Sequence, residues 1–173
     1  FLTEADLPAL GAYGLMKPEL KTSADRGALW LALARGVIDV VESDHAPHTI
    51  GEKESDTPPF GVPGLETTLP LMLLAVHDGC VTLEQVIPLL SENPRRIWGL
   101  TVPEDTYALV DLSAPYTIDR SRLHTGCGWS PFEGMRVPGR VVETWIRGRK
   151  VYDGERVIAP PGSGRSLFGA DAT

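Results

Sequence analysis

The chain has 173 residues and a formal net charge of −7, with 42% hydrophobic and 23% charged residues, which is ordinary for one soluble globular domain or one and a half. The lack of a basic stripe argues against a nucleic-acid partner, and no apolar run is long enough to cross a bilayer. The first residues do not resemble a signal peptide, and Cys80 and Cys127 predict two reduced thiols in a cytoplasmic protein.

The first part of the chain predicts a helix followed by a buried strand. Residues 1–22 contain several glycines and prolines and predict a loop. The next segment predicts a helix that Thr22 or Ser23 caps and that Gly36 ends. The β-branched run over residues 37–41 then predicts a short buried strand.

A long loop and further helices follow this strand. The loop covers residues 44–63, and loops of this length inside a compact domain are often functional. Residues 64–79 predict a second helix, in which Pro70 indicates a late start or an early kink. Residues 82–100 predict a third helix and a short fourth one that begins at Pro94.

After residue 100 the pattern becomes that of strands. Apolar and polar residues alternate in "YALVDL", "RVVETWIRG" and "KVYDG", and a hairpin is expected to turn at Gly148-Arg149. The fold class is therefore α/β: residues 1–100 predict the end of an alternating α/β array, and residues 101–173 predict a small antiparallel domain with a tail. Neither part is expected to close by itself, because a single βα unit cannot bury its sheet and a few C-terminal strands leave bare edges. A complete (β/α)8 barrel needs about 250 residues.

The polar stretch after the predicted strand is "SDHAPHTIGEK", residues 43–53. Asp44 lies at the carboxyl end of that strand, where α/β folds place their chemistry. An aspartate can bind zinc or act as a general base, and His48 follows four residues later. On spacing alone, the simpler interpretation is a loop aspartate with a capping role and a solvated histidine.

The wider sequence favours a functional site at this stretch over the simpler interpretation as a capping loop. Several motifs occur in order: "KPELKT", "SDHAPHT", "PFGVPGLETTLPLMLLAV", "ENPRRIWGL", "EDTYALVDL" and "SPFEGMRVPGRVVETWIRGRKVYDG". Together they resemble the dihydroorotases, a family of zinc-dependent cyclic amidohydrolases, and most closely the dihydroorotase domain of the animal multifunctional pyrimidine-synthesis proteins. The resemblance extends from residue 1 to about residue 168.

This resemblance implies a fold, a metal and a reaction. The implied fold is a (β/α)8 barrel with a small β-sandwich built from both chain ends, of which residues 1–100 would be the C-terminal part of the barrel and residues 101–173 the C-terminal sandwich strands and tail. One or two zinc ions would lie at the top of the barrel. The implied reaction interconverts N-carbamoyl-aspartate and dihydroorotate in pyrimidine synthesis.

The resemblance also assigns roles to individual residues. Asp44 matches an aspartate that ligates zinc and moves the proton, and His48 matches a histidine that contacts the substrate. Phe60 and Gly61 match a loop whose backbone meets the pyrimidine ring. Lys17 stands where relatives have an arginine near the substrate carboxylate, which keeps the charge but loses the bidentate fork.

The chain also departs from the family pattern. Its four histidines include no HxH pair, which the family uses for its first zinc ligands. The chain is therefore expected to be the C-terminal part of a dihydroorotase, with the other zinc ligands upstream, and to be inactive alone. Expected partners are a small-molecule substrate, the N-terminal part of the same barrel, further copies in a homo-oligomer and, in one alternative, aspartate carbamoyltransferase.

Two alternatives stay open. One is another cyclic amidohydrolase, such as dihydropyrimidinase or allantoinase, although these relatives usually lack a histidine matching His48. The other is a non-catalytic amidohydrolase-like protein that serves as a scaffold for aspartate carbamoyltransferase. The presence of both Asp44 and His48 argues against the non-catalytic alternative.

Overall fold

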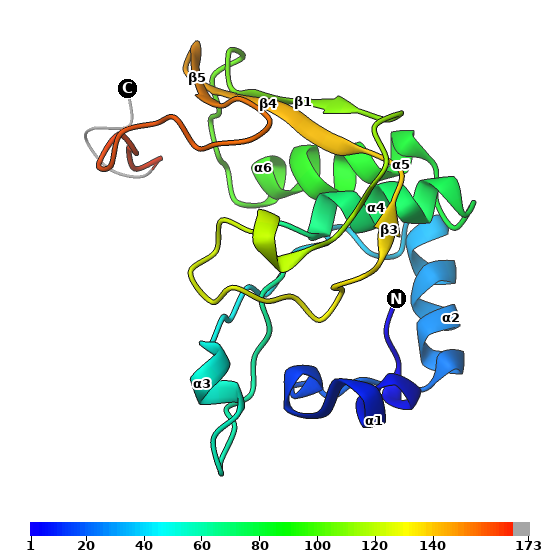
Figure 1. Cartoon of the computed structure of the whole chain (residues 1–173). Helices are drawn as coiled ribbons and strands as arrows, with labels where there is room; N and C mark the ends of the chain where they lie inside the picture. Colours follow the sequence, from blue (N-terminus) through cyan, green and yellow to red (C-terminus); the bar gives the residue numbers. More distant parts are fainter. Residues whose placement is uncertain (168–173) are drawn as a thin grey trace.

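The computed structural model describes residues 1–167, so the last six residues of the predicted tail lie outside the described part. Figure 1 shows helices α4, α5 and α6 beneath the β1-β4-β5 strands, with the loop that carries α3 at the far end of the molecule. None of the helices in the described residues is long and apolar enough to cross a membrane.

Three short helical turns replace the loop predicted at the start of the chain. They are a 3-10 turn over Glu4–Asp6, α1 over Leu7–Leu10 and a second 3-10 turn over Gly11–Gly14. The prediction was wrong here because Thr3 and Asp6 form a local capping box, in which the Asp6 carboxylate accepts from the Thr3 backbone N–H at 2.7 Å. Pro8, in the first turn of α1, is compatible with that start.

Helix α2 spans Ser23–Ala34 and confirms the predicted start. The Thr22 side chain accepts from the Asp25 backbone N–H at 3.2 Å, and Asp25 bonds back to Thr22. Gly36, with a φ of 69°, follows its C-terminal turn in the left-handed conformation that glycine adopts at little cost.

The predicted strand over residues 37–41 is absent from the two sheets of the described chain. A strand needs a neighbour for its N–H and C=O groups, and neither sheet supplies one to this segment. Its backbone instead bonds to the helical region: the Val41 N–H donates to Leu89 O at 3.1 Å, and the Asn93 side chain donates to Asp39 O at 2.8 Å.

Helices α4 (Thr68–His77), α5 (Leu83–Ile87) and α6 (Asn93–Ile97) follow the predicted order with corrected bounds, and a π-helical turn (Pro88–Glu92) lies between α5 and α6. Helix α3 (Ile50–Lys53) was not predicted, because it lies inside the segment that was expected to be a loop. The late start of α4 is confirmed, and it places Pro70 in the first turn, where no intrahelical N–H bond is lost. Trp98, which follows the last residue of α6, is 56% exposed.

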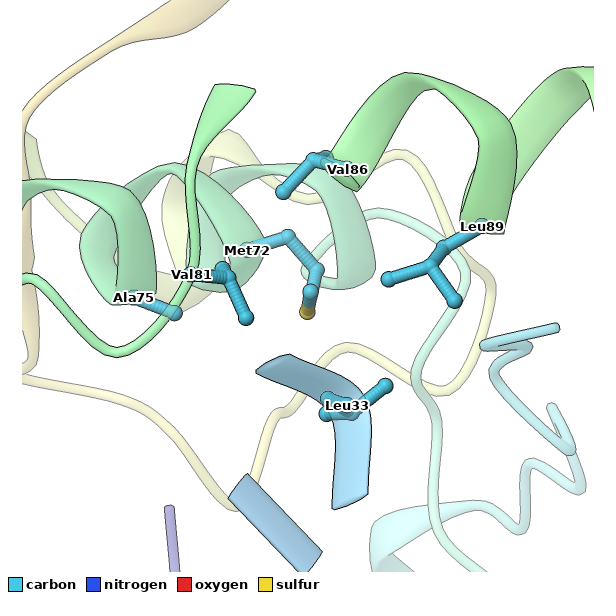
Figure 2. Close-up of a cluster of buried hydrophobic side chains, with 6 residues drawn as sticks. All are labelled: Leu33, Met72, Ala75, Val81, Val86 and Leu89. Atoms are coloured by element: carbon cyan, nitrogen blue, oxygen red, sulfur yellow. The ribbon is translucent and has the colours of Figure 1, made fainter. Parts of the chain in front are cut away.

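Helix α4 is the centre of the hydrophobic core. One side, with Met72 and Ala75, packs with Leu33 of α2, Val86 and Leu89 (Figure 2). Another side packs through Leu71 against Ile118 and Val137. A helix that is apolar on most sides is buried by neighbours on most sides, so α4 joins the helices to the strands.

The strands form two antiparallel sheets. One contains β1 (Tyr107–Asp111), β4 (Arg140–Ile146) and β5 (Arg149–Tyr152) in the order β1-β4-β5, and the other pairs β2 (Tyr116–Thr117) with β3 (Arg136–Val137). The β4-β5 hairpin pairs Ile146 with Arg149, so its turn is Arg147-Gly148, one residue earlier than predicted. Both turn residues have positive φ, at 50° and 68°, as a type I′ turn requires.

Candidate functional site

Asp44 lies at the start of the long loop in a conformation that is uncommon for a non-glycine residue. Its φ is 42°, in the left-handed region that aspartate tolerates better than most residues. Its backbone N–H donates to Glu42 Oε2 at 2.7 Å, and its side chain is exposed. This turn directs the chain from residues 37–43 into the loop and leaves the carboxylate accessible.

The two arms of the loop lie against each other. The Ala46 N–H donates to Val62 O at 3.1 Å. Gly61 has a φ of 129°, and a Cβ there would lie 2.6 Å from Ala46 O and 3.3 Å from the His48 ring. A side chain at Gly61 would therefore force the arms apart, which explains why glycine occupies this position.

Four of the predicted site residues gather at this loop. His48 Nε2 lies 3.1 Å from Phe60 O, and because a carbonyl only accepts, Nε2 carries the ring hydrogen. The Lys17 ammonium lies 4.4 Å from the centre of the Phe60 ring, and the Gly61 N–H donates to Leu15 O at 3.0 Å. The structure thus brings Lys17, His48, Phe60 and Gly61 together from two separate segments.

His45, the other histidine of the opening motif, is part of the loop framework. Its Nδ1 accepts hydrogen bonds from the backbone N–H groups of Gly64 and Leu65, at 3.1 and 3.2 Å. Since Nδ1 accepts from both groups, its lone pair is used within the protein. His45 therefore ties the start of the loop to the segment before α4, as a structural residue.

Comparison with known proteins identifies relatives that match more than nine-tenths of the chain, although no model of a known protein family matches it. The chain is 45% identical to the multifunctional protein CAD of Squalus acanthias over 96% of its own length, and 38% identical to the dihydroorotase of Pyrococcus furiosus over 93%. It spans only 7% of the first relative and 39% of the second.

Solved structures also match most of this chain over less than half of their own length. The L-hydantoinase (dihydropyrimidinase) of Arthrobacter aurescens matches 91% of the chain, with 29% identity and a TM-score of 0.86, over 38% of its own length. The inactive dihydroorotase-like domain of the Chaetomium thermophilum CAD-like multifunctional protein matches 93% of the chain, with 26% identity and a TM-score of 0.70, over 44% of its own length.

The chain resembles the C-terminal part of the dihydroorotases. Its fold is accordingly that of a partial amidohydrolase barrel followed by strands, as the sequence predicted. The sequence motifs that carried the resemblance therefore identified the correct group of proteins.

The zinc site expected of a dihydroorotase can be tested against the residues present. Within residues 1–167, no three or more histidine, cysteine, aspartate or glutamate side chains cluster as metal ligands. A catalytic zinc ion takes about three protein ligands, and Asp44 would supply one. The described residues therefore do not form a zinc site by themselves.

The sequence did not indicate a role for two buried residues in or beside the loop over residues 44–63. Lys53, the last residue of α3, is 0% exposed, and Trp129 is 2% exposed. The Trp129 indole N–H donates to His48 O at 2.7 Å across 81 residues of sequence. The one local signal is the "TIGE" capping box at Thr49 and Glu52, which predicts the short helix that ends at Lys53.

A separate cavity of about 570 Å³ lies between the start of α4 and the strands. Its lining includes His45, Leu65, Tyr116, Arg140 and Tyr152, but not Asp44, His48 or Phe60. The predicted site residues therefore lie at the loop over residues 44–63 and do not line this cavity.

Proposed function

We propose that this chain contributes the substrate loop and one catalytic carboxylate to a dihydroorotase, which interconverts N-carbamoyl-aspartate and dihydroorotate. The observation that carries the proposal is the gathering of Lys17, His48 and Phe60 at one loop, within a chain similar to dihydroorotases over more than nine-tenths of its length. Because the chain spans less than half of those relatives, the activity is proposed for the complete protein that contains it.

The proposed roles follow from the chemistry of each group. Lys17 supplies a positive charge for the substrate carboxylate, and it lies over the Phe60 ring, where the aromatic face favours a cation. His48 donates from Nε2 to Phe60 O, so its Nδ1 can accept a hydrogen bond when the ring is neutral. The carbonyl oxygens of Phe60 and Gly61 each accept one hydrogen bond within the protein, and each has a second lone pair that can accept from a planar ring.

Asp44 is the proposed proton carrier. When water attacks the carbonyl carbon of the ring amide, the exposed carboxylate can take the proton of that water and return it to the ring nitrogen that leaves. We propose that it is also a ligand of one or two zinc ions, together with groups from outside the described residues. The barrel would be completed by a further part of the same protein.

The proposal extends to the setting of the enzyme. A dihydroorotase of this kind acts in pyrimidine synthesis, and we place it in the cytoplasm. Association with aspartate carbamoyltransferase and with further copies of the same protein is part of the proposal, since one of its relatives is a multifunctional protein.

The test is a comparison of substrates with the complete natural protein. Ring opening of dihydroorotate is measured by chromatography beside dihydrouracil, which has the same ring without the carboxylate. We expect kcat/KM to favour dihydroorotate by at least about a hundredfold, because Lys17 loses its partner in dihydrouracil. Lys17→Met is expected to reduce this preference, and residues 1–173 alone are expected to be inactive.

Two other results would each replace the proposal. A preference for dihydrouracil would make the protein a dihydropyrimidinase-like amidohydrolase, in line with its structural similarity to the Arthrobacter aurescens enzyme. Turnover of neither ring would favour a non-catalytic role, as in the inactive domain of Chaetomium thermophilum. Sedimentation with and without aspartate carbamoyltransferase would then test for a scaffold.

A further inference from the structure

Lys53 is the one buried charged side chain among residues 1–167, and no carboxylate is paired with it. It is 0% exposed at the end of α3, a helix of only four residues. Burial lowers the pKa of its amino group from the ordinary value, because an ammonium loses hydration there. A charge in such a place needs strong local compensation.

The compensation comes from backbone carbonyl groups. The Lys53 ammonium donates to Pro59 O at 2.8 Å, to Gly61 O at 3.2 Å and to Leu15 O at 3.4 Å. An ammonium has three hydrogens, so these three carbonyls use its donors completely. The Trp129 ring, whose centre lies 5.6 Å from the ammonium, adds a cation–π contact.

These carbonyls belong to the proposed substrate loop and to the segment beside it. Pro59 and Gly61 are the two neighbours of Phe60, so Lys53 holds the backbone on both sides of that ring. Leu15 lies two residues before Lys17, and its carbonyl also accepts from the Gly61 N–H at 3.0 Å. One buried cation thus joins the segment that carries Lys17 to the loop that carries Phe60.

Trp129 connects the same cation to His48. Its ring faces the Lys53 ammonium, while its indole N–H donates to His48 O at 2.7 Å. Tyr13 packs edge-on against the indole, with ring centres 4.9 Å apart, and fixes its orientation. The backbone of His48 is therefore set by a side chain that also contacts Lys53.

We propose that Lys53 is a positioning residue, whose buried ammonium holds the Phe60–Gly61 backbone, the Lys17 segment and, through Trp129, His48 in the arrangement that binds the substrate. This inference rests on the proposed function for the roles of those residues. Removing the charge leaves the Pro59, Gly61 and Leu15 carbonyls without this donor. The loop then relaxes, while Asp44 at the other end keeps the hydrogen bond from its backbone N–H to Glu42 Oε2.

The experiment compares Lys53→Met, which keeps the length and removes the charge, with Lys53→Arg, which keeps the charge. Lys21→Met is the matched control, because Lys21 is exposed and lies outside the loop. In the complete natural protein we expect Lys53→Met to raise KM for dihydroorotate by about tenfold or more with kcat within about threefold, since only binding is lost. Lys53→Arg is expected to recover part of the KM, and Lys21→Met to resemble wild type.

Amide hydrogen exchange gives a readout independent of turnover. The Ala46 and Gly61 amides, which join the loop arms and the Leu15 segment, are expected to exchange at least about tenfold faster in Lys53→Met, through local opening. A lower melting temperature with unchanged KM and unchanged loop exchange would make Lys53 a purely structural residue and overturn the proposal. If wild type does not turn over dihydroorotate, the proposed function fails, but the exchange comparison still supports or overturns the role of Lys53.

A second variant covers the case in which Lys53→Met does not fold. Trp129→Phe keeps an aromatic face toward Lys53, removes the N–H bond to His48 O and leaves a smaller ring against Tyr13. We expect it to raise KM severalfold and to accelerate exchange around residue 48. Wild-type KM and wild-type exchange in this folded variant would overturn the proposed connection between Lys53 and His48.

Discussion

The two ends of the long loop are held in different ways. At its start, Asp44 has a left-handed backbone, an exposed side chain and a bond to its neighbour Glu42. At its other end, the Phe60–Gly61 segment is fixed by Lys53 of the same loop and by Leu15 from an earlier segment of the chain. The proposed substrate-binding half is therefore self-supporting within residues 1–167, whereas the proposed catalytic half needs groups from elsewhere.

This difference suits the two tasks proposed for the loop, because binding a substrate and moving a proton place different demands on the backbone. A group that binds a planar ring needs rigid backbone nearby, which local and long-range hydrogen bonds supply. A carboxylate that moves a proton must stay accessible, and its exact place depends on the metal and the substrate. Four changes would break or sharpen the contrast between the two ends.

The largest expected effect is on turnover, from Asp44→Asn in the complete protein. Asparagine also tolerates the left-handed conformation at this position, so the fold and the melting temperature should stay as in wild type. Loss of the proton carrier should lower kcat/KM for dihydroorotate by about 10²- to 10⁴-fold in steady-state assays. A near-normal rate would show that Asp44 has no catalytic role.

The next effect is on stability, from Gly61→Ala. The φ of 129° and a Cβ placed 2.6 Å from Ala46 O should together cost about 3 kcal/mol. Gly11→Ala is the control: its φ is 52°, but nothing lies within 4 Å of its Cβ, so about 1 kcal/mol is expected. Equal losses in urea denaturation would contradict the close packing of the two loop arms.

A smaller effect is expected from Glu42→Ala, which removes the acceptor for the Asp44 N–H. An exposed hydrogen bond contributes roughly 0.5–1 kcal/mol, so kcat/KM should fall by about two- to fivefold as Asp44 samples other conformations. Hydrogen exchange of the Ala46 and Gly61 amides should not change. Faster exchange at both would mean that the two ends of the loop are coupled and that the contrast between them is wrong.

The smallest effect concerns pH. The Thr49 hydroxyl and N–H bond to Glu52 and lower the pKa of its carboxyl below the ordinary 4.5. The capping box therefore stabilises α3 fully above about pH 4.5, and this contribution is lost as the pH falls through the lowered pKa. Exchange of the Lys53 amide should accelerate in that range. Glu52→Gln, which also completes a capping box, should remove this pH dependence, and an unchanged profile would exclude Glu52 as its source.

The sequence predicted best those elements that local chemistry determines. The α2 start at Thr22, the late start of α4 around Pro70 and the β4-β5 hairpin all depend on residues within one turn of each other. The strand over residues 37–41 failed because a strand depends on a partner, and the described chain contains none for it. β-branched residues indicate a preference for extended backbone but cannot supply that partner.

The same distinction applies to the site. The motif made Asp44 and His48 candidates, and the family resemblance assigned roles to them and to Lys17 and Phe60. The structure brings Lys17, His48 and Phe60 together, and the roles themselves stay predictions. Lys53 was missed because a lysine in a polar loop is usually solvated. Its burial results from carbonyls at residues 15, 59 and 61, and no side-chain pattern in the sequence reports where those backbone groups meet.

The bond from Trp129 to the carbonyl of His48 also sets an order in time. A ribosome adds about 5–20 residues per second, so the indole is made roughly 4 to 16 seconds after the histidine whose backbone it holds. During that interval the nascent loop lacks this contact. A polypeptide that ends before residue 129, for example at the helix-to-strand transition near residue 100, never acquires it, even though all the residues proposed to meet the substrate have been synthesised.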